Sequence, residues 1–302
     1  MNIFVIGATG FVGGALARHL AGSGHAVAGL ARTDAATAAL DARGVTPVAA
    51  DLKTRLPAML AAARQADAVV YAAQAEPAQE TAAVEDLTRT LAGTGKTLLF
   101  LSGSGVLLQR TAGAWSQDTF AEHDPFTVEP LAEFRKASED TVLAAAADGV
   151  RAMVIRPGLI WGPGDHGHVS MTYQSVAATG AACYVGLGLN TYSNVHIDDV
   201  THLFTLALQT GRAGALYHAA AGEIPNRWIA ERVAADLGVE TRSVTPAEAP
   251  GVWGDFGALI MGASSRLRAV SARRELGWQP EHTDMLSMIG EPRLRELAHG
   301  RS

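Results

Sequence analysis

Three glycines near the N-terminus constrain the fold of this chain more than any other feature. Gly7, Gly10 and Gly13 recur at every third position, between an apolar run at 2–6 and a segment at 14–20 with apolar residues at helical spacing. A short apolar run bounded by glycine is typical of a buried strand, and the periodic segment predicts a helix that faces a sheet. We therefore expect a strand, a tight turn and a helix here.

Each glycine of this turn has a physical role. The first permits a tight turn, the second lets backbone approach a ligand, and the third lets the helix pack close to the strand. The helix start carries unpaired N–H groups and the positive end of the helix dipole, which favour an anion. We expect the pyrophosphate of a dinucleotide there. The predicted cofactor-binding residues of this segment are Gly7, Thr9, Gly10, Phe11, Val12 and Gly13.

A second predicted strand, at 25–31, should end beside the adenosine ribose. An acidic residue at that end would bind the 2′-hydroxyl, but the chain has Arg32 and then Thr33. A guanidinium offers a permanent charge and a planar fork of donors, which suit a 2′-phosphate. The sequence therefore favours NADP over NAD. The alternative is that Arg32 is an ordinary surface residue and that Asp34 binds the ribose of NAD.

Strands and helices alternate beyond this point. Further strands are predicted at 45–50, 68–72, 97–101, 151–156 and 216–219, with helices at 35–43, 56–63, 80–91, 130–147 and from 194 to about 209. This alternation predicts an α/β fold: a Rossmann-type doubly wound parallel sheet with a smaller, mostly helical C-terminal substrate-binding part. The Rossmann domain should span 1–164, with 194–220 returning to its sheet, and the substrate-binding part 165–193 and 221–302.

Size and composition limit the classes of function. The chain has 302 residues, a net charge of −6 and a single cysteine, Cys183. The negative charge argues against nucleic acid or an anionic membrane as a partner, and one cysteine excludes an internal disulfide and a thiolate metal cluster. The N-terminus has no signal-peptide pattern, and no apolar run approaches the ~20 residues that span a bilayer. We expect a cytoplasmic protein that binds a small-molecule substrate, with a homodimer as a compatible assembly.

Motifs along nearly the whole chain resemble those of the extended or atypical short-chain dehydrogenase/reductase superfamily, to which the NAD-dependent epimerases and dehydratases belong. The segments that carry the resemblance are 7–13, 51–52, 156–158, 161–164, 195–200 and 275–280. The resemblance implies further cofactor contacts from Asp51 and Leu52 at the adenine, Ala72 and Ala73 through their backbone, and Pro157 and Gly158 at the nicotinamide. For Asp198 and Asp199 we prefer a structural role, as N-terminal caps of the following helix.

The chemistry of this superfamily normally needs a Ser or Thr that positions the substrate oxygen, a Tyr that transfers its proton, and a Lys four residues later. The ammonium lowers the pKa of the phenol toward working pH. Ser104 matches the serine position best, and Ser102 is the alternative. The Tyr–Lys pair is missing, because the aligned positions hold Leu131 and Arg135. Arg135 can still bond the ribose hydroxyls, but leucine cannot donate a proton.

Moving the alignment by one residue does not restore the pair, since it places Ala132 and Lys136 at the two positions. Lys136 would then hold the ribose, and the phenol would still be missing. In either register the usual proton relay is absent.

Another group must then supply the proton. Tyr192 is the preferred candidate, ahead of Tyr173 and Tyr184, because it directly precedes a segment that lines the substrate pocket in relatives. A packing tyrosine is the alternative for each. His166 and His168 could act as acid–base groups near neutral pH, but we prefer a role as polar groups that line the pocket. Two histidines lack the three or four ligands that a zinc site needs, so no metal is predicted.

The sequence thus predicts an NADP-dependent oxidoreductase or epimerase-like enzyme of the atypical type. Its substrate would be a small or medium organic molecule with a carbonyl or hydroxyl group, or one similar to a nucleotide sugar. The predicted catalytic residues are Ser104, Arg135 and Tyr192. The alternative is a non-catalytic NADP-binding redox sensor or regulatory protein, because the loss of the Tyr–Lys pair would suit a protein without turnover.

Overall fold

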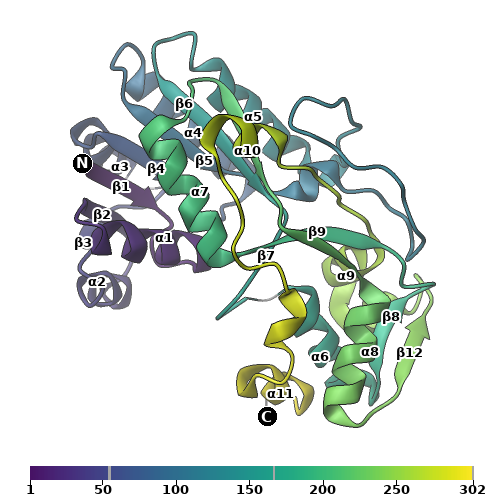
Figure 1. Ribbon diagram of the computed structural model, residues 1–302. Helices are drawn as coiled ribbons and strands as arrows, with labels where there is room; N and C mark the ends of the chain where they lie inside the picture. The colour runs from purple at the N-terminus through teal and green to yellow at the C-terminus, as the bar shows by residue number, and fades with distance from the viewer. Residues whose placement is uncertain (54–55, 166, 301–302) are drawn as a thin grey trace.

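A computed structural model describes residues 1–53, 56–165 and 167–300 of the chain. Its centre is a seven-stranded parallel sheet (Figure 1). The strands lie in the order β10-β6-β5-β4-β1-β2-β3 and comprise β1 (Asn2–Ile6), β2 (Ala26–Ala31), β3 (Thr46–Ala49), β4 (Ala68–Tyr71), β5 (Thr97–Leu101), β6 (Arg151–Pro157) and β10 (Ala215–Ala219). The order of the strands reverses between β1 and β4, and ligands of such sheets bind at the reversal. The predicted α/β fold with a Rossmann-type sheet is confirmed.

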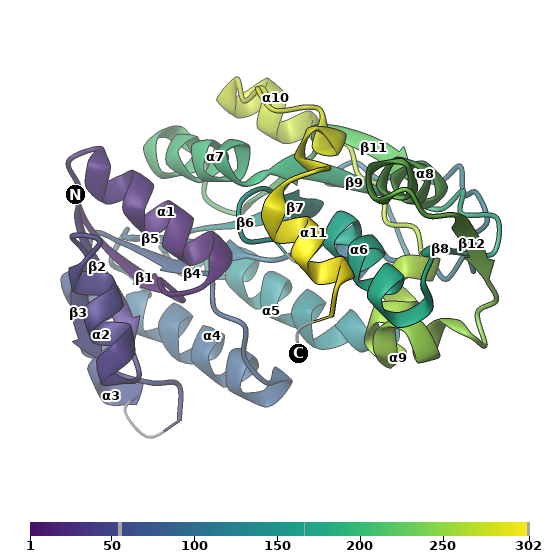
Figure 2. The ribbon, with the colours of Figure 1, turned by 90° about the horizontal axis from the view of Figure 1, so that it is seen from below.

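Helices cover both faces of this sheet, as Figure 2 shows. On one face lie α1 (Phe11–Gly22), α2 (Asp34–Asp41), α7 (Ile197–Thr210) and α10 (Val270–Leu276), and on the other α3 (Leu56–Gln65), α4 (Pro77–Leu91) and α5 (Glu133–Ala144). Successive strand residues point to opposite faces. In β1, Ile3 and Val5 therefore join the core on the α1 side, and Phe4 and Ile6 join the core on the α4 side. Because both faces of the central strands are buried, these strands are largely apolar, and Arg156 of β6 and His218 of β10 are buried polar exceptions.

A smaller, mostly helical region lies to one side of the large sheet (Figures 1 and 2). It contains β7 (Leu159–Trp161), α6 (His168–Thr179), β8 (Ala182–Val185), β9 (Thr191–His196), β11 (Gly222–Pro225), α8 (Asn226–Leu237), β12 (Thr241–Val244), α9 (Ala249–Gly262) and α11 (Pro292–Ala298). Strand β9 joins β11 and β7 in a small sheet, and β12 pairs with β8. The bounds of the two predicted domains stay a prediction. Among the described residues, no helix is both long and apolar enough to cross a bilayer.

The part of the chain that the structure describes also has three short 3₁₀ helices: η1 (Ser104–Leu107), η2 (Pro130–Ala132) and η3 (Met285–Met288). The first two bound the long connection between β5 and α5. That connection is anchored by a buried carboxylate, because Glu122 accepts the N–H groups of Val270 at 3.1 Å and Ser271 at 2.9 Å. A carboxylate at these amides stabilises the start of α10. Glu122 therefore fixes the long connection to the C-terminal part of the chain, at the start of α10.

The structure corrects the prediction for the segment around residue 196. Residues 194–196 extend β9, so α7 begins at Ile197 rather than at 194. Its cap is His196, whose Nδ1 accepts the Asp198 N–H at 3.2 Å. The predicted capping by Asp198 and Asp199 is therefore wrong. Asp199 instead accepts the backbone N–H groups at 281 and 282, which holds the C-terminal segment against α7.

A buried charged cluster joins β6, β10 and α5. Arg156 donates to Glu139 Oε1 at 2.9 Å, makes a second, shorter bond to Oε2, and approaches His218 Nε2 at 3.0 Å. All three side chains are buried. Burial, and secondly the charge of Arg156, lower the pKa of His218 to about 3. His218 is therefore neutral in the folded protein at pH 7.

We predict that acid destabilises the protein through His218. Its pKa falls from an ordinary 6.5 to about 3 on folding, so below pH 6.5 the unfolded chain binds a proton that the folded chain cannot. The free energy of unfolding therefore decreases as the pH falls from 6.5 toward 3. In His218→Gln this contribution is missing, so the stability gap between the two proteins should narrow from pH 7.5 to pH 5. Urea unfolding at both pH values measures the gap, and a constant gap would contradict the prediction.

Candidate cofactor and active site

The predicted glycine turn brings three backbone segments into contact. A Cβ on Gly13 would overlap the Gly7 carbonyl oxygen, and a Cβ on Gly7 would lie 2.6 Å from the Ala72 carbonyl oxygen and 2.8 Å from the Ala73 nitrogen. Gly7 also has a φ of 98°, which favours glycine. The Gly10 N–H closes the turn on the Gly7 carbonyl at 2.9 Å. The ends of β1 and β4 and the start of α1 therefore meet at one place.

The start of α1 can hold an anion. The helix begins at Phe11, its N-cap is Gly10 without a side-chain hydrogen bond, and its first turn has no acidic residue. Thr9 and Gly10 are exposed at this point, while Phe11 and Val12 are half-buried. Free amides at the positive end of a 12-residue helix are a ready anion site. The turn and the helix start thus fit the pyrophosphate of a dinucleotide.

Alanine substitutions in α1 test this site. We expect Gly13→Ala to weaken dinucleotide binding at least tenfold, because its Cβ would overlap the Gly7 carbonyl and force the turn apart. Such overpacking should also cost about 1–3 kcal/mol of stability. Gly22→Ala is the matched control, since a Cβ on Gly22 has nothing within 4 Å. Fluorescence titration with NADPH and thermal unfolding measure both effects, and equal affinities of the two variants would exclude the turn as the binding site.

Two arginines lie near the expected adenosine end. Arg32 is exposed and directly follows β2, and Thr33 caps α2 by accepting the Ala36 N–H at 3.1 Å. Arg43, which the sequence analysis missed, lies beyond the other end of α2. Its guanidinium reaches back to the Ala8 carbonyl at 3.5 Å, within the glycine turn. Arg43 therefore adds a second positive charge beside the proposed cofactor site.

The segment after β3 carries the predicted adenine contacts. Asp51 and Leu52 are both half-buried, and Asp51 Oδ1 accepts the Lys53 N–H at 2.7 Å. The parallel pairing of β3 with β2 brings this segment beside the strand that leads to Arg32. The predicted adenine and ribose contacts therefore come from neighbouring strand ends.

At the expected nicotinamide end, Gly158 allows a close approach of two strands. A Cβ on Gly158 would overlap the Ser193 carbonyl oxygen, and its N–H donates to the Ala219 carbonyl at 2.9 Å. Pro157 is the buried last residue of β6. The predicted nicotinamide segment therefore contacts the backbone of β9 next to Tyr192, the predicted proton donor.

Ser104 lies at the carboxyl end of β5, where it opens η1 and is 4% exposed. Its carbonyl accepts a hydrogen bond from Ser265 Oγ at 2.6 Å. The Ser265 N–H in turn donates to the Thr191 carbonyl of β9 at 3.0 Å. Ser265 thus links the Ser104 segment to the strand that carries Tyr192. For Ser102, the alternative, the described residues provide no partner to its buried Oγ.

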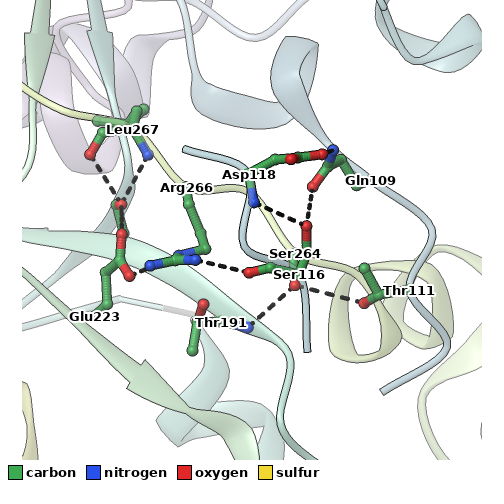
Figure 3. Close-up of polar contacts among 10 residues, drawn as sticks. Gln109, Thr111, Ser116, Asp118, Thr191, Glu223, Ser264, Arg266 and Leu267 are labelled. Atoms are coloured by element: carbon green, nitrogen blue, oxygen red, sulfur yellow. Dashed lines mark hydrogen bonds and ion pairs between the residues drawn. The ribbon is translucent and has the colours of Figure 1, made fainter. Parts of the chain in front are cut away.

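A polar network holds the Ser265 segment in place (Figure 3). Arg266 donates to Glu223 Oε2 and to the Ser116 carbonyl, both at 2.7 Å. On the other side of Ser265, the Ser264 Oγ accepts the Thr191 N–H at 3.3 Å. The C-terminal segment therefore meets β9, β11 and the long connection that follows β5 around Ser265. No local sequence pattern marks this position, because its contacts join distant segments.

Tyr192 and His168 form a buried neutral pair. Their rings meet edge to face with centroids 4.7 Å apart, and among the described residues neither Tyr192 Oη nor His168 Nε2 has a hydrogen-bond partner. Burial, and secondly the charge of Glu129, raise the pKa of Tyr192, while burial lowers the pKa of His168 to about 4. At pH 7 the phenol therefore keeps its proton and the imidazole is uncharged. His166, the other predicted acid–base candidate, lies outside the described residues.

The other two tyrosine candidates have packing contacts. Tyr173 Oη donates to Asp236 at 2.6 Å and accepts the Gly290 N–H at 3.0 Å. The ring of Tyr184 lies under the Arg227 guanidinium, 5.7 Å from it. Both arrangements agree with the structural alternative for these residues, so Tyr192 is the candidate that stays a proposal.

The two residues at the positions of the missing Tyr–Lys pair, Leu131 and Arg135, lie in different surroundings. Leu131 belongs to η2 and is 60% exposed. Arg135 contacts the buried Glu80 at 2.8 Å and donates to the Leu101 carbonyl at 3.2 Å. Burial raises the pKa of Glu80, and the guanidinium opposes that rise. Arg135 thus ties α4 and the end of β5 to α5, and its predicted contact with the ribose stays a prediction.

The C-terminal helix fixes a loop near the glycine turn. Arg293 of α11 donates to the Gly162 carbonyl at 3.0 Å and to Asp165 Oδ1 at 3.2 Å. Within this loop, a Cβ on Gly164 would lie 3.9 Å from the ring of Phe11, the first residue of α1. Arg293 is therefore a positioning residue for a loop at the candidate cofactor site, and the sequence analysis missed it.

One cluster has ligand atoms at metal-like spacing. His196, Asp198 and His282 place such atoms within 4.8 Å of one another. The two imidazole rings stack, however, with centroids 4.2 Å apart and planes at 28°. His196 Nδ1 already accepts the Asp198 N–H. Because an imidazole binds a metal in its ring plane, stacked rings cannot direct their lone pairs to a common ion, and we assign no metal centre here.

Comparison with known proteins gives consistent results. Residues 3–220 match the profile of the NAD-dependent epimerase/dehydratase family. An uncharacterized protein of Schizosaccharomyces pombe is 32% identical over 95% of this chain and 97% of its own length. A 4-hydroxy-2-methyl-3-oxo-4-farnesyl-3,4-dihydroquinoline-1-oxide ketoreductase of Stigmatella aurantiaca is 25% identical over 92% of each chain. The fold is similar to that of the dTDP-glucose 4,6-dehydratase DesIV of Streptomyces venezuelae, solved with NAD and TYD bound, with a TM-score of 0.76, 21% identity and coverage of 98% and 96% of the two chains.

Proposed function

The chain belongs to the NAD-dependent epimerase/dehydratase family of short-chain dehydrogenases/reductases, and from this premise we propose that it is an NADP-dependent oxidoreductase. Its substrate would be a small or medium organic carbonyl or hydroxyl compound. The observation that carries the proposal is the close approach of the Gly13 backbone to the Gly7 carbonyl, which only a residue without a Cβ permits. It lies beside the start of α1, where no side chain caps the helix amides. The relative from Stigmatella aurantiaca is a ketoreductase by name, which supports carbonyl reduction over epimerisation.

Different residues of the chain have different roles in this reaction. When bound, the cofactor would supply the hydride for the carbonyl carbon and become NADP⁺, and a proton from the protein would convert the carbonyl oxygen to a hydroxyl. The glycine turn and the start of α1 hold the pyrophosphate. Pro157 and Gly158 form the backbone wall at the nicotinamide. Ser104, at the end of β5, donates a hydrogen bond to the reacting oxygen and polarises it.

Tyr192 is the proposed proton donor. Its raised pKa keeps the phenol protonated at neutral pH, so it is suited to donate to the alkoxide that carbonyl reduction produces. The absence of a hydrogen-bond partner for its hydroxyl among the described residues leaves its proton uncommitted. At neutral pH the phenol is therefore in the form that donates a proton to an alkoxide, whereas alcohol oxidation would need its phenolate as the base.

Cofactor preference is tested at Arg32. We expect NADPH to bind better than NADH, because Arg32 and Arg43 place two positive charges at the adenosine end. Arg32→Asp should reverse the order, since a carboxylate repels the 2′-phosphate. Arg232→Asp, an equal charge change at an exposed position of α8, is the control and should leave the order unchanged. Titration of each protein with both cofactors measures this, and equal affinities in the unchanged protein would remove the basis for the NADP assignment.

Ser104 is tested by activity. Ser104→Ala should lower kcat/KM for carbonyl reduction about 100-fold, as loss of one donor to a developing oxyanion does, while NADPH affinity stays the same. Ser102→Ala serves as the comparison, because Ser102 is the second serine at the same strand end. Full activity of Ser104→Ala with loss of activity in Ser102→Ala would transfer the role to Ser102.

A second candidate is a non-catalytic NADP-binding redox sensor or regulatory protein. It is favoured by Leu131 and Arg135 at the positions of the usual tyrosine and lysine. Tight NADPH binding without oxidation across a broad panel of carbonyl compounds would support it over the enzyme. A cytoplasmic location and a homodimer stay predictions from the sequence.

A further inference from the structure

Helix α9 is almost wholly apolar, yet it is incompletely buried. Its one charged residue is Asp255. Phe256 is 72% exposed, and Trp253, Leu259 and Ile260 are only partly buried. A helix that is apolar on all sides is normally enclosed, and exposed apolar patches mark binding surfaces. The helix therefore presents apolar side chains that the rest of the described chain leaves partly uncovered.

This apolar surface is continuous with the proposed active site. Leu259 and Ile260 pack in one cluster with Leu108, Leu159 and Tyr192. Leu108 follows η1, Leu159 begins β7 directly after the nicotinamide segment, and Tyr192 is the proposed proton donor. The Ile260 carbonyl also accepts a hydrogen bond from the ring of His168. Helix α9 thus contacts the segments that carry or adjoin the reacting groups.

The electrostatics around this cluster disfavour an anionic substrate. The charge that raises the pKa of Tyr192, after burial, is the carboxylate of Glu129, and its hydrogen bond to Arg110 keeps the pKa of Glu129 below its usual range. The cation next to this carboxylate, Arg110, forms an ion pair with it at 2.5 Å, and its side chain is 60% exposed. A phosphate needs cations or several donors when it leaves water, and beside Tyr192 it would meet the carboxylate of Glu129, with which Arg110 is already paired.

We propose that the substrate is an uncharged, largely apolar carbonyl compound whose hydrocarbon part lies against Phe256, Leu259 and Ile260 of α9. Its reacting oxygen would face Ser104, at the other side of the cluster. A nucleotide-linked sugar would place its diphosphate among leucine, isoleucine and tyrosine side chains. The inference rests on the function proposed above and adds the chemical class of the substrate.

A homologous series of methyl ketones, from 2-butanone to 2-dodecanone, tests this assignment with the full-length protein and NADPH. We expect kcat/KM to rise with chain length, by up to about fourfold for each methylene group that is buried against α9. UDP-glucose and UDP-galactose should neither be converted nor inhibit ketone reduction. Conversion of a nucleotide sugar with a higher kcat/KM than the longest ketone would overturn the assignment.

Substitution of Phe256 locates the effect. Phe256→Ser should raise KM for the long ketones at least fivefold and leave kcat, the KM for 2-butanone and NADPH affinity unchanged. Because Phe256 is largely exposed, this change should not prevent folding. The matched control is Trp228→Ser, which removes an aromatic side chain that is 58% exposed on α8 and should have no effect on either ketone.

The two proposals fail in different ways. Ketone reduction that is independent of chain length, or equally affected by the two serine substitutions, overturns the apolar assignment and leaves the NADPH-dependent chemistry in place. Absence of turnover with every ketone overturns the proposed function. In that case the inference is decided by binding: 2-dodecanone should raise the melting temperature of the unchanged protein more than that of Phe256→Ser, and equal shifts would overturn it.

Discussion

The contact between the Gly13 backbone and the Gly7 carbonyl is the constraint on which the rest of the structure depends. It exists because neither position carries a Cβ, and it sets the start of α1 directly on the end of β1. Strand β1 lies at the reversal of strand order, so the same contact places the anion-binding end of α1 over the crevice between β1 and β4. The other proposed reacting groups lie along the same edge of the sheet, because the carboxyl ends of parallel strands all lie there. A side chain at either glycine would separate the helix from the strand and move the whole edge.

The lost Tyr–Lys pair changes the electrostatics of the site as well as its proton relay. The family resemblance implies a lysine whose ammonium lowers the pKa of the phenol, whereas the residue that we align with it, Arg135, is engaged with Glu80 and the Leu101 carbonyl. The candidate phenol, Tyr192, is buried, and its pKa is raised by this burial and, secondly, by the charge of Glu129. A phenol of this kind is a donor and not a base at neutral pH. The proposed chemistry therefore depends on burial rather than on a neighbouring positive charge.

The sheet and the glycine turn could be predicted because their signals are local: apolar runs of strand length, helical periodicity and a fixed glycine spacing. The start of α7 could not, since residues 194–196 join β9 through pairing with β11 and β7, which the sequence does not display. Arg43, Ser265 and Arg293 were missed for a related reason. Their contacts span 35, 161 and 128 residues of the chain, and each looks locally like an ordinary polar residue. A single side chain that bonds to a residue far along the chain produces no periodic pattern in the sequence.

The net charge of −6 argues against nucleic acid as a partner but does not indicate which small molecules the chain binds, because charges and dipoles are unevenly placed along it. At the adenosine end, Arg32, Arg43 and the amides of α1 favour phosphates. At the proposed substrate end, Tyr192 packs against leucine, isoleucine and alanine side chains and against the ring of His168, and the carboxylate of Glu129 is the charge that acts on the phenol. In the proposed site, one edge of the sheet would thus hold an anionic cofactor and disfavour an anionic substrate. The difference follows from position, since a buried phosphate is stabilised only where cations or amide donors already point at it.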